Sequence, residues 1–197
     1  FEFSSSWNRD SRNSAVFPDE GSYQRFRAEL GAPGGVEYFK INYRHDLFYP
    51  ITEDYTLLLK ADMGVGDGYG DHSTLPFFNR YYAGGEGSIR GFEGNSIGPV
   101  DNAGAVGGNI KGVFNAEVIL PIPLLESVKS TRISGFVDMG TVANNTSGLS
   151  DQLRASAGVT AKWLSPVGPL TFSWAKPLKK KSADKLEAFQ FRMGQMF

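Results

Sequence analysis

The chain has 197 residues, no cysteine and a formal net charge of −1. The near-neutral charge gives no indication of nucleic acid as a partner. The absence of cysteine excludes disulfides, thiol catalysis and thiolate metal sites. Twenty-four glycines and 13% aromatic residues, with little helical periodicity, favour an all-β chain that is one domain or part of a larger one.

Most of the chain alternates apolar and polar residues with a period of two, which is typical of β-strands. Many of the predicted strands have 10 or more residues, whereas strands of soluble proteins have about 5–6. A strand that crosses a bilayer needs about 9–11 residues, so strand length predicts a membrane-spanning sheet. Nine strands are predicted, at residues 1–9, 21–31, 36–49, 55–66, 107–120, 130–140, 152–164, 168–177 and 187–197.

The two faces of these strands differ in chemistry. From Phe39 to Tyr49 the odd positions are mostly apolar and the even positions mostly polar. The polar faces mix glycines with lysines and arginines, which a dry core would not tolerate because buried charges need partners. A water-filled lumen would tolerate such charges. We therefore expect the polar faces to line a lumen and the apolar faces to contact lipid. The prediction is an all-β, antiparallel transmembrane β-barrel portion with about eight or nine strands across residues 1–197.

The predicted connections alternate in character along the chain. Those after the first, third, fifth and seventh strands are rich in turn residues, at 17–21, 50–54, 121–123 and 165–168. Short periplasmic turns that alternate with longer outer loops are typical of outer-membrane barrels, and this order places the C-terminus on the periplasmic side. Because such barrels usually have an even number of strands, residues 1–9 are the first candidate for a frayed strand.

The longest connection, residues 67–106, carries the sequence Ile89-Arg90-Gly91-Phe92 after a glycine-rich run. Glycines let a backbone approach a wall closely, and an arginine away from water needs carboxylate partners. Glu117 and Asp138 fall on the polar faces of neighbouring predicted strands. We therefore predict that the loop folds inward and that Arg90 pairs with both carboxylates, with an exposed loop arginine as the alternative.

The last predicted strand, 187–197, has Phe189, Phe191, Met193 and Phe197 on one face and Gly194 on the other. This pattern favours a targeting strand that an assembly machine recognises by adding it to a sheet edge. An ordinary edge strand with an aromatic end is the alternative. For the nearby run 179–181 of three lysines, solvated loop charges are the favoured interpretation, and contact with lipid headgroups is the alternative.

Catalysis and metal binding have little support in the sequence. His45 and His72 have no cysteine partner and no Gly-x-Ser-x-Gly motif nearby. His45 falls on an apolar face near a strand end, where an interfacial side chain is the simpler account. The aspartates at 62, 67 and 71 lack the spacing of an EF-hand. We therefore predict no catalytic residue, no metal and no cofactor.

Several segments together resemble the BamA family, the central subunits of the bacterial outer-membrane β-barrel assembly machine. They are Tyr81–Gly85, Arg90–Phe92, Asn95–Pro99, Gly107–Asn109, Phe136–Val142, Trp163–Leu170 and the ending from Phe189 to Phe197. The resemblance runs through nearly the whole chain. It implies the C-terminal part of a larger barrel, whose other strands and periplasmic POTRA domains lie outside this sequence.

The resemblance also implies a location and a set of roles. The location is the outer membrane of a Gram-negative bacterium, and the role of the full protein is the folding and insertion of other outer-membrane β-barrels. The implied partners are outer-membrane lipids, nascent β-barrel clients and assembly-machine lipoproteins, the last mainly through the periplasmic domains. Arg90, Gly91 and Phe92 would anchor the loop against Glu117 and Asp138, and strand 187–197 would form one side of a lateral gate.

Other functions stay open at this point. Secretion pores of the two-partner and TamA types share the loop arginine, so Arg90 does not separate them from the BamA family, although the segments around Asp138 and Trp163–Leu170 favour BamA. A passive porin would not need a locked loop of this kind. A soluble lectin-like β-sandwich is disfavoured by the strand lengths.

Overall fold

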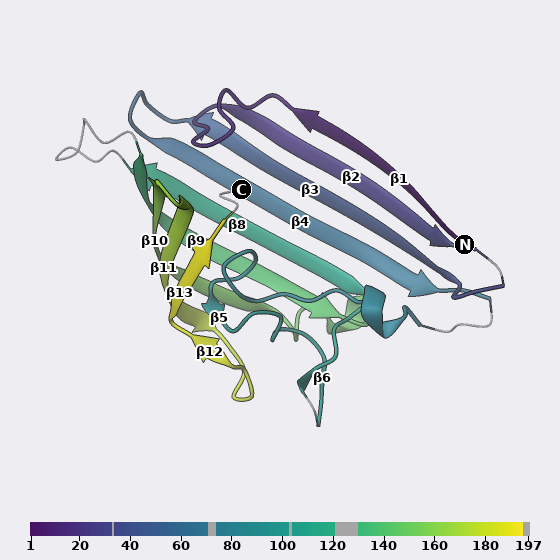
Figure 1. Cartoon of the computed structure of the whole chain (residues 1–197). Coiled ribbons are helices and arrows are strands. Elements are labelled where there is room, and N and C mark those ends of the chain that lie inside the picture. Colours follow the sequence, from purple (N-terminus) through teal and green to yellow (C-terminus); the bar gives the residue numbers. More distant parts are fainter. Residues whose placement is uncertain (33, 71–73, 103, 121–129, 195–197) are drawn as a thin grey trace.

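A computed structural model describes residues 1–32, 34–70, 74–102, 104–120 and 130–194 of the chain. In this part of the chain, nine antiparallel strands form one sheet in the order β1-β2-β3-β4-β8-β9-β10-β11-β13, and Figure 1 shows that the sheet curls round at its β9–β13 end. These strands are β1 (Glu2–Asp10), β2 (Gly21–Gly31), β3 (Tyr38–Pro50), β4 (Thr56–Gly68), β8 (Ile110–Leu120), β9 (Thr131–Ala143), β10 (Arg154–Ser165), β11 (Gly168–Lys179) and β13 (Phe189–Met193). The all-β, antiparallel prediction is confirmed.

Short elements occupy the connections. They are the 3-10 helices η1 (Phe77–Asn79) and η3 (Thr146–Gly148) and the two-residue strands β5 (Gly91–Phe92), β6 (Val100–Asp101), β7 (Gly104–Ala105) and β12 (Leu186–Glu187). No helix among the described residues is long and apolar enough to cross a bilayer. The predicted turn at 121–123 and His72 lie outside the described residues.

Two predictions about the ends of the sheet are wrong. The predicted frayed strand, residues 1–9, instead pairs continuously with β2 from Glu2↔Gly31 to Asp10↔Tyr23, because β2 satisfies the backbone groups along that edge. The predicted strand 187–197 is divided, since Glu187 pairs with Gly91 of the long loop and only Phe189–Met193 pairs with β11. Phe197 lies outside the described residues.

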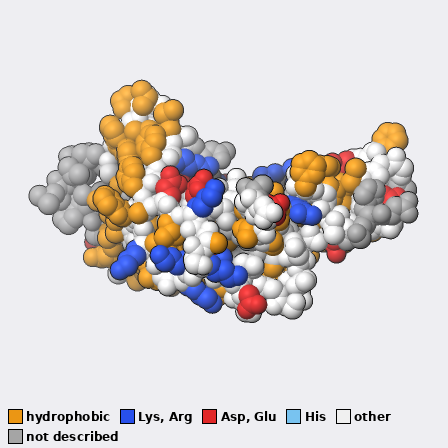
Figure 2. All heavy atoms as spheres, turned by 90° about the horizontal axis from the view of Figure 1, so that it is seen from below, with side chains coloured by type: hydrophobic (Ala, Val, Ile, Leu, Met, Phe, Trp, Pro, Cys, Tyr) orange, Lys and Arg blue, Asp and Glu red, His pale blue; other side chains and the backbone are white. Residues whose placement is uncertain are grey.

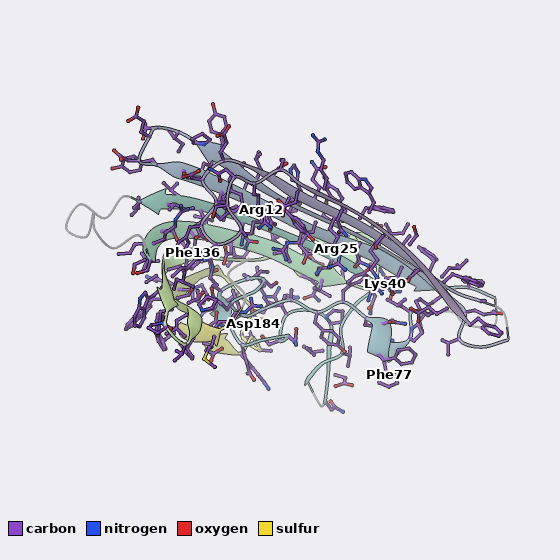
Figure 3. All side chains as sticks on the ribbon, turned by 45° about the horizontal axis from the view of Figure 1, so that its top comes forward. Arg12, Arg25, Lys40, Phe77, Phe136 and Asp184 are labelled. Carbon is purple, nitrogen blue, oxygen red and sulfur yellow. The ribbon has the colours of Figure 1, made fainter. Side chains whose placement is uncertain are left out.

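The two faces of the sheet have the chemistry that the sequence predicts. Trp7, Phe26 and Tyr43 occupy one outward row across β1, β2 and β3, and Trp7 is 51% exposed. The adjacent inward row brings Arg25 opposite Arg44 and Arg44 opposite Asp62. Figure 3 shows the side chains of both faces on the ribbon, with Arg25 among those labelled. The polar inner face and apolar outer face are those of a barrel wall with a wet lumen.

The connection between β4 and β8 folds back over the inner face of the sheet (Figure 1). Backbone bridges Tyr81↔Gly108 and Ala83↔Ile97 organise it. Its apolar side chains form one buried cluster with residues of β3, β8 and β9, namely Tyr38, Leu75, Tyr81, Ala83, Ile89, Phe92, Ile97, Val113 and Val142. The predicted inward-folding loop is therefore confirmed.

One glycine of the wall makes this loop packing possible. Gly64 of β4 faces the ring of Tyr81, and a Cβ atom at position 64 would lie 2.4 Å from that ring. The Tyr81 hydroxyl reaches past Gly64 and donates a hydrogen bond to the Ile41 carbonyl at 3.0 Å. The close approach of loop and wall thus depends on a residue without a side chain.

A second connection, residues 11–20 between β1 and β2, also reaches across the inner face. The Arg132 guanidinium of β9 donates hydrogen bonds to the carbonyls of Phe17 and Pro18, at 2.8 and 2.7 Å, and lies 5.0 Å from the centre of the Phe17 ring. Pro18 is fully buried although it belongs to a turn. The connection therefore acts as a strap that links the first and sixth strands of the sheet.

Candidate functional site

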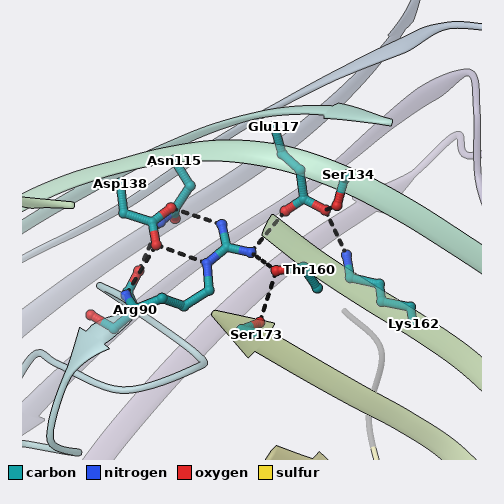
Figure 4. Close-up of polar contacts among 9 residues, drawn as sticks. Arg90, Asn115, Glu117, Ser134, Asp138, Thr160, Lys162 and Ser173 are labelled. Atoms are coloured by element: carbon teal, nitrogen blue, oxygen red, sulfur yellow. Dashed lines mark hydrogen bonds and ion pairs between the residues drawn. The ribbon is translucent and has the colours of Figure 1, made fainter. Parts of the chain in front are cut away.

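Arg90 lies at the point where the long loop meets the barrel wall. The side chain is 5% exposed, and Figure 4 shows its guanidinium directed between β8, β9 and β10. Nε and Nη2 donate to the two carboxylate oxygens of Asp138, each at 2.8 Å, and the Arg90 backbone N–H donates to the same carboxylate at 3.0 Å. This fork-like, two-point pairing is the strongest geometry available to an arginine and a carboxylate.

The remaining nitrogen of the guanidinium, Nη1, contacts the two strands on either side of β9, namely β8 and β10. It donates to Glu117 Oε2 at 3.2 Å and to Thr160 Oγ1 at 2.9 Å. The guanidinium plane also lies over the Phe136 ring, with Cζ 3.3 Å from the ring centre, which is a cation–π contact. Every nitrogen of the guanidinium therefore has a partner in the wall.

A second cation completes the charge balance around Glu117. Lys162 Nζ donates to Glu117 Oε1 at 3.1 Å, and the Ser134 hydroxyl donates to the same oxygen at 2.6 Å. Two cations, Arg90 and Lys162, thus face two buried carboxylates (Figure 4). A buried ionic group is tolerated when its charges and hydrogen bonds are satisfied in this way.

The strand register explains why these side chains converge. Asn115 of β8 lies opposite Asp138 of β9, and Glu117 lies opposite Phe136. Thr160 of β10 lies opposite Ser134 of β9. All of these residues occupy alternate positions of their strands, so their side chains point to the same inner face.

Sequence reasoning left two members of the site unassigned. The sequence pattern predicted no role for Lys162 or Thr160 in the ionic cluster, although both share one face of the period-two pattern at 154–163. The available signal is their alternate spacing along β10. Once the strand pairing is known, the register places Thr160 opposite Ser134 and Lys162 two residues farther along the same inner face.

The residues after Arg90 attach the loop to the end of the sheet. Gly91 has φ = +86°, a backbone conformation that favours glycine, and its position would bring a Cβ 3.1 Å from Ala175 Cβ. Phe92 is fully buried and pairs with Leu186 in the small β5–β12 ladder. The Gln190 side chain of β13 donates to the Phe92 carbonyl at 2.7 Å.

The C-terminal candidates lie apart from the ionic cluster. Phe189, Phe191 and Met193 of β13 are exposed on the outer face, between 51% and 66%. The Gly194 backbone N–H donates to the Pro169 carbonyl at 2.9 Å, which extends the contact with β11 by one residue. The structure therefore joins Arg90, Gly91, Phe92, Glu117 and Asp138 in one site, whereas the side chains of Phe189, Phe191 and Met193 point to the outer face of the sheet.

Burial and neighbouring charges shift the pKa values of two ionisable groups of the loop, Arg90 and Glu86. Burial alone would lower the pKa of Arg90, but the hydrogen bonds and charge of Asp138 outweigh it and raise that pKa. Burial raises the pKa of the Glu86 carboxyl, and the neighbouring Ser173 and Arg90 offset only part of this effect. Arg90 is thus held as a cation, whereas Glu86 is the loop acid whose charge is disfavoured. Within the described ranges, no group of three or more histidine or acidic side chains could hold a metal ion.

The sheet has an apolar outer face, a polar inner face and a long loop that is folded inside and held by a buried arginine. These features together are those of an outer-membrane β-barrel with an inward loop. The family model of the Omp85 superfamily domain matches residues 1–197. The chain belongs to the Omp85 superfamily.

Individual relatives agree with this assignment. The chain is 35% identical to "Outer membrane protein assembly factor BamA" of Neisseria meningitidis over 97% of its own length and 28% of that protein. It is 27% identical to "Sorting and assembly machinery component 50 homolog" of Mus musculus, over 95% of the chain and 44% of the relative. The chain therefore spans less than half the length of these curated relatives.

A solved structure gives the same answer for the fold. The crystal structure of BamA from Haemophilus ducreyi lacking POTRA domains 1–3 matches with a TM-score of 0.88 and 33% sequence identity, over 97% of this chain and 41% of that one. The resemblance to the BamA family that the sequence motifs indicated is confirmed. The Neisseria relative is named as an assembly factor, and the mouse relative as a component of a sorting and assembly machinery.

Proposed function

We propose that this chain forms a wall segment and the inward loop of a protein that folds and inserts β-barrel proteins into the outer membrane of a Gram-negative bacterium. The observation that carries the proposal is the similarity, over nearly the whole chain, to two proteins named for outer membrane protein assembly and for sorting and assembly. The activity would belong to the whole protein, of which this chain is a part. Its partners would be outer-membrane lipids, nascent β-barrel clients and assembly-machine lipoproteins.

We assign the ionic cluster an anchoring role within that function. Arg90 would fix the loop to the wall through Asp138 and Glu117, while Gly91 and Phe92 would attach it beside the terminal strand. An anchored loop would keep the lumen in one shape while the edge of the sheet engages a client. This role needs no catalytic residue, metal or cofactor.

The terminal segment would carry a second role, as a targeting signal and as one side of a lateral gate. The candidate residues are Phe189, Phe191, Met193, Gly194 and Phe197. Exposed aromatic residues on alternate positions suit recognition by strand addition. Substituting Phe197→Ala in the full-length protein should reduce its own insertion in cells, and undiminished insertion would remove the targeting role.

The decisive experiment is depletion of the full-length protein in its native bacterium, followed by quantitation of all outer-membrane barrels. A fall across many unrelated barrels is the expected result for a general insertase. A loss confined to one secreted passenger would instead favour a secretion pore of the same superfamily, such as a two-partner or TamA-type protein.

A further inference from the structure

A strongly basic segment covers the end of β11 and the connection that follows it. Residues 176–185 contain five lysines and a single acid, Asp184. The five lysines are exposed, namely Lys176, Lys179, Lys180, Lys181 and Lys185. We call residues 176–185 the basic segment. Its charge is high enough to attract anions at the surface.

The one acid of the basic segment is already engaged elsewhere. Asp184 accepts hydrogen bonds from Arg154 Nε and Nη2 at 2.5 and 2.8 Å, and Arg154 is itself buried. Lys185 Nζ lies 3.9 Å from Glu93. Among the described residues, no ion pair joins Lys176, Lys179 or Lys180 to an acid, so the positive charge is not neutralised within this part of the chain.

The basic segment adjoins a group of aromatic side chains that contact one another on the outer face. Trp174 of β11 contacts Phe189 of β13 with ring centres 6.1 Å apart, and Phe172 contacts Phe191 at 5.2 Å. Trp174 is 66% exposed. Figure 2 shows apolar side chains gathered over the part of the molecule where β10, β11 and β13 lie, with Lys and Arg side chains beside them. Exposed tryptophan and phenylalanine on a barrel's outer face are typical of the membrane interface.

The strand geometry connects the aromatic group to the lysines. Lys176 is the next outward residue after Trp174, about 6–7 Å farther along the strand, and its neighbour in β10 is the small Ala157. A register shift at Ala155/Ser156 then brings Lys179 opposite Ala155. Because these neighbours are small, the aliphatic stems of both lysines can lie along the apolar wall while the ammonium groups reach toward headgroups.

We propose that the basic segment binds the phosphate groups of anionic lipids in the leaflet at this end of the barrel, the outer leaflet in the orientation proposed above. The occupant is a lipid because the cations continue a bilayer-facing apolar surface. A ligand that contacts both the apolar outer face and the basic segment must carry acyl chains directly beside an anionic phosphate. The inference rests on the strands crossing a membrane and does not depend on the assembly activity.

The test uses the full-length protein in phosphatidylcholine nanodiscs that contain a small share of fluorescent phosphatidylglycerol. Energy transfer from a dye near the basic segment reports local enrichment of the anionic lipid. The variant replaces Lys176, Lys179 and Lys180 with glutamine. Enrichment should fall about tenfold or more, since each basic residue near an anionic surface contributes a factor of roughly five.

Two matched controls separate charge from shape and from remote effects. Arginine at the same three positions keeps the charge and should preserve the enrichment. Arg25→Gln removes a cation from the inner face of β2 and should leave it unchanged. Equal enrichment in the glutamine variant and the parent would overturn the proposal.

A further measurement decides the matter if the glutamine variant does not insert. Enrichment around the unmodified protein should decline as salt is raised, because exposed charges are screened within about 8–10 Å at physiological ionic strength. Enrichment that does not respond to salt, or that is equal for neutral and anionic fluorescent lipids, would overturn the proposal.

Discussion

At the scale of single residues, Arg90 determines how the loop meets the wall. Its side chain is buried beside Asp138 and Glu117, and its sequence neighbours Ile89 and Phe92 belong to the buried hydrophobic cluster. Removing one partner of a buried ion pair leaves an uncompensated charge, which costs more than the pair itself contributes. Substitutions here therefore test the anchoring role directly.

Arg90→Ala should destabilise the packed loop by about 3–5 kcal/mol, because Asp138 would remain buried without a cation and Glu117 would keep only Lys162. The measurement is limited proteolysis of the folded protein within residues 67–106. Lys180→Ala, which removes an exposed cation outside this loop, serves as the control and should leave the cleavage rate unchanged. Unaltered protection in Arg90→Ala would contradict the anchoring role.

Arg90→Glu should be more damaging than Arg90→Ala. It would place a third carboxylate against Glu117 and Asp138, and like charges at short range oppose ionisation and packing. We expect a lower folding yield and a lower temperature for loss of the heat-resistant folded band on gels. Identical values for the two variants would indicate that the side chain at this position does not approach the carboxylates.

The stability of the packed loop should depend on pH through the Glu86 carboxyl. Its folded pKa is raised above the ordinary value of 4.5, mainly by burial, and one of its carboxylate oxygens is buried without a hydrogen-bond partner in the described structure. Stability from this group is present below pH 4.5 and is lost as pH rises through the raised pKa. Protease protection of the loop should decline over that pH range. Glu86→Gln should remove this dependence on pH. A Glu86→Gln variant with the same pH profile as the parent would contradict the role of Glu86.

At the scale of elements, two connections link parts of the sheet that are distant in sequence. The long loop contacts β8, β9 and β10 through Arg90 and pairs with β12 through Phe92. The strap at residues 11–20 reaches β9 through Arg132. The strap joins strands that are not neighbours in the sheet, and the long loop joins three consecutive strands to the segment just before β13. Contacts of this kind hold the curled sheet together.

Arg132→Ala should release the strap. The substitution removes two hydrogen bonds from a charged donor, each worth about 1.5–3 kcal/mol, and the contact with the Phe17 ring. We expect protease cleavage within residues 11–20 to become faster while cleavage in the long loop stays slow. Arg9→Ala, at an exposed site on β1, is the control. Equal resistance of both variants would show that the strap is held by other contacts.

At the scale of the whole molecule, the described sheet is open, with β1 and β13 at its two edges. An exposed edge presents unpaired backbone groups to another chain. Residues 1–197 produced alone in detergent should therefore associate through these edges, giving a light-scattering mass above that of one copy. A single-copy mass at every concentration would show instead that the sheet closes on itself.

Much of this architecture follows from local patterns. Alternation from Phe39 to Tyr49 identified the outward and inward faces, and strand length identified a membrane-type sheet. Glu117 and Asp138 fell on inward positions by the same alternation. These properties depend only on the period-two geometry of a strand, which each segment carries in its own sequence.

Contacts between distant segments could not be obtained in this way. The pairing of Glu187 with Gly91, which shortens β13, and the contacts of Lys162 with Glu117 and Arg132 with Pro18 depend on how the sheet curls. Curvature and register set which inward side chains meet, and alternation contains no information about either. Alternation within each segment gives most of the strands, their faces and the loop motif, whereas the curl and register of the sheet set which charges are neighbours and where the terminal strand begins.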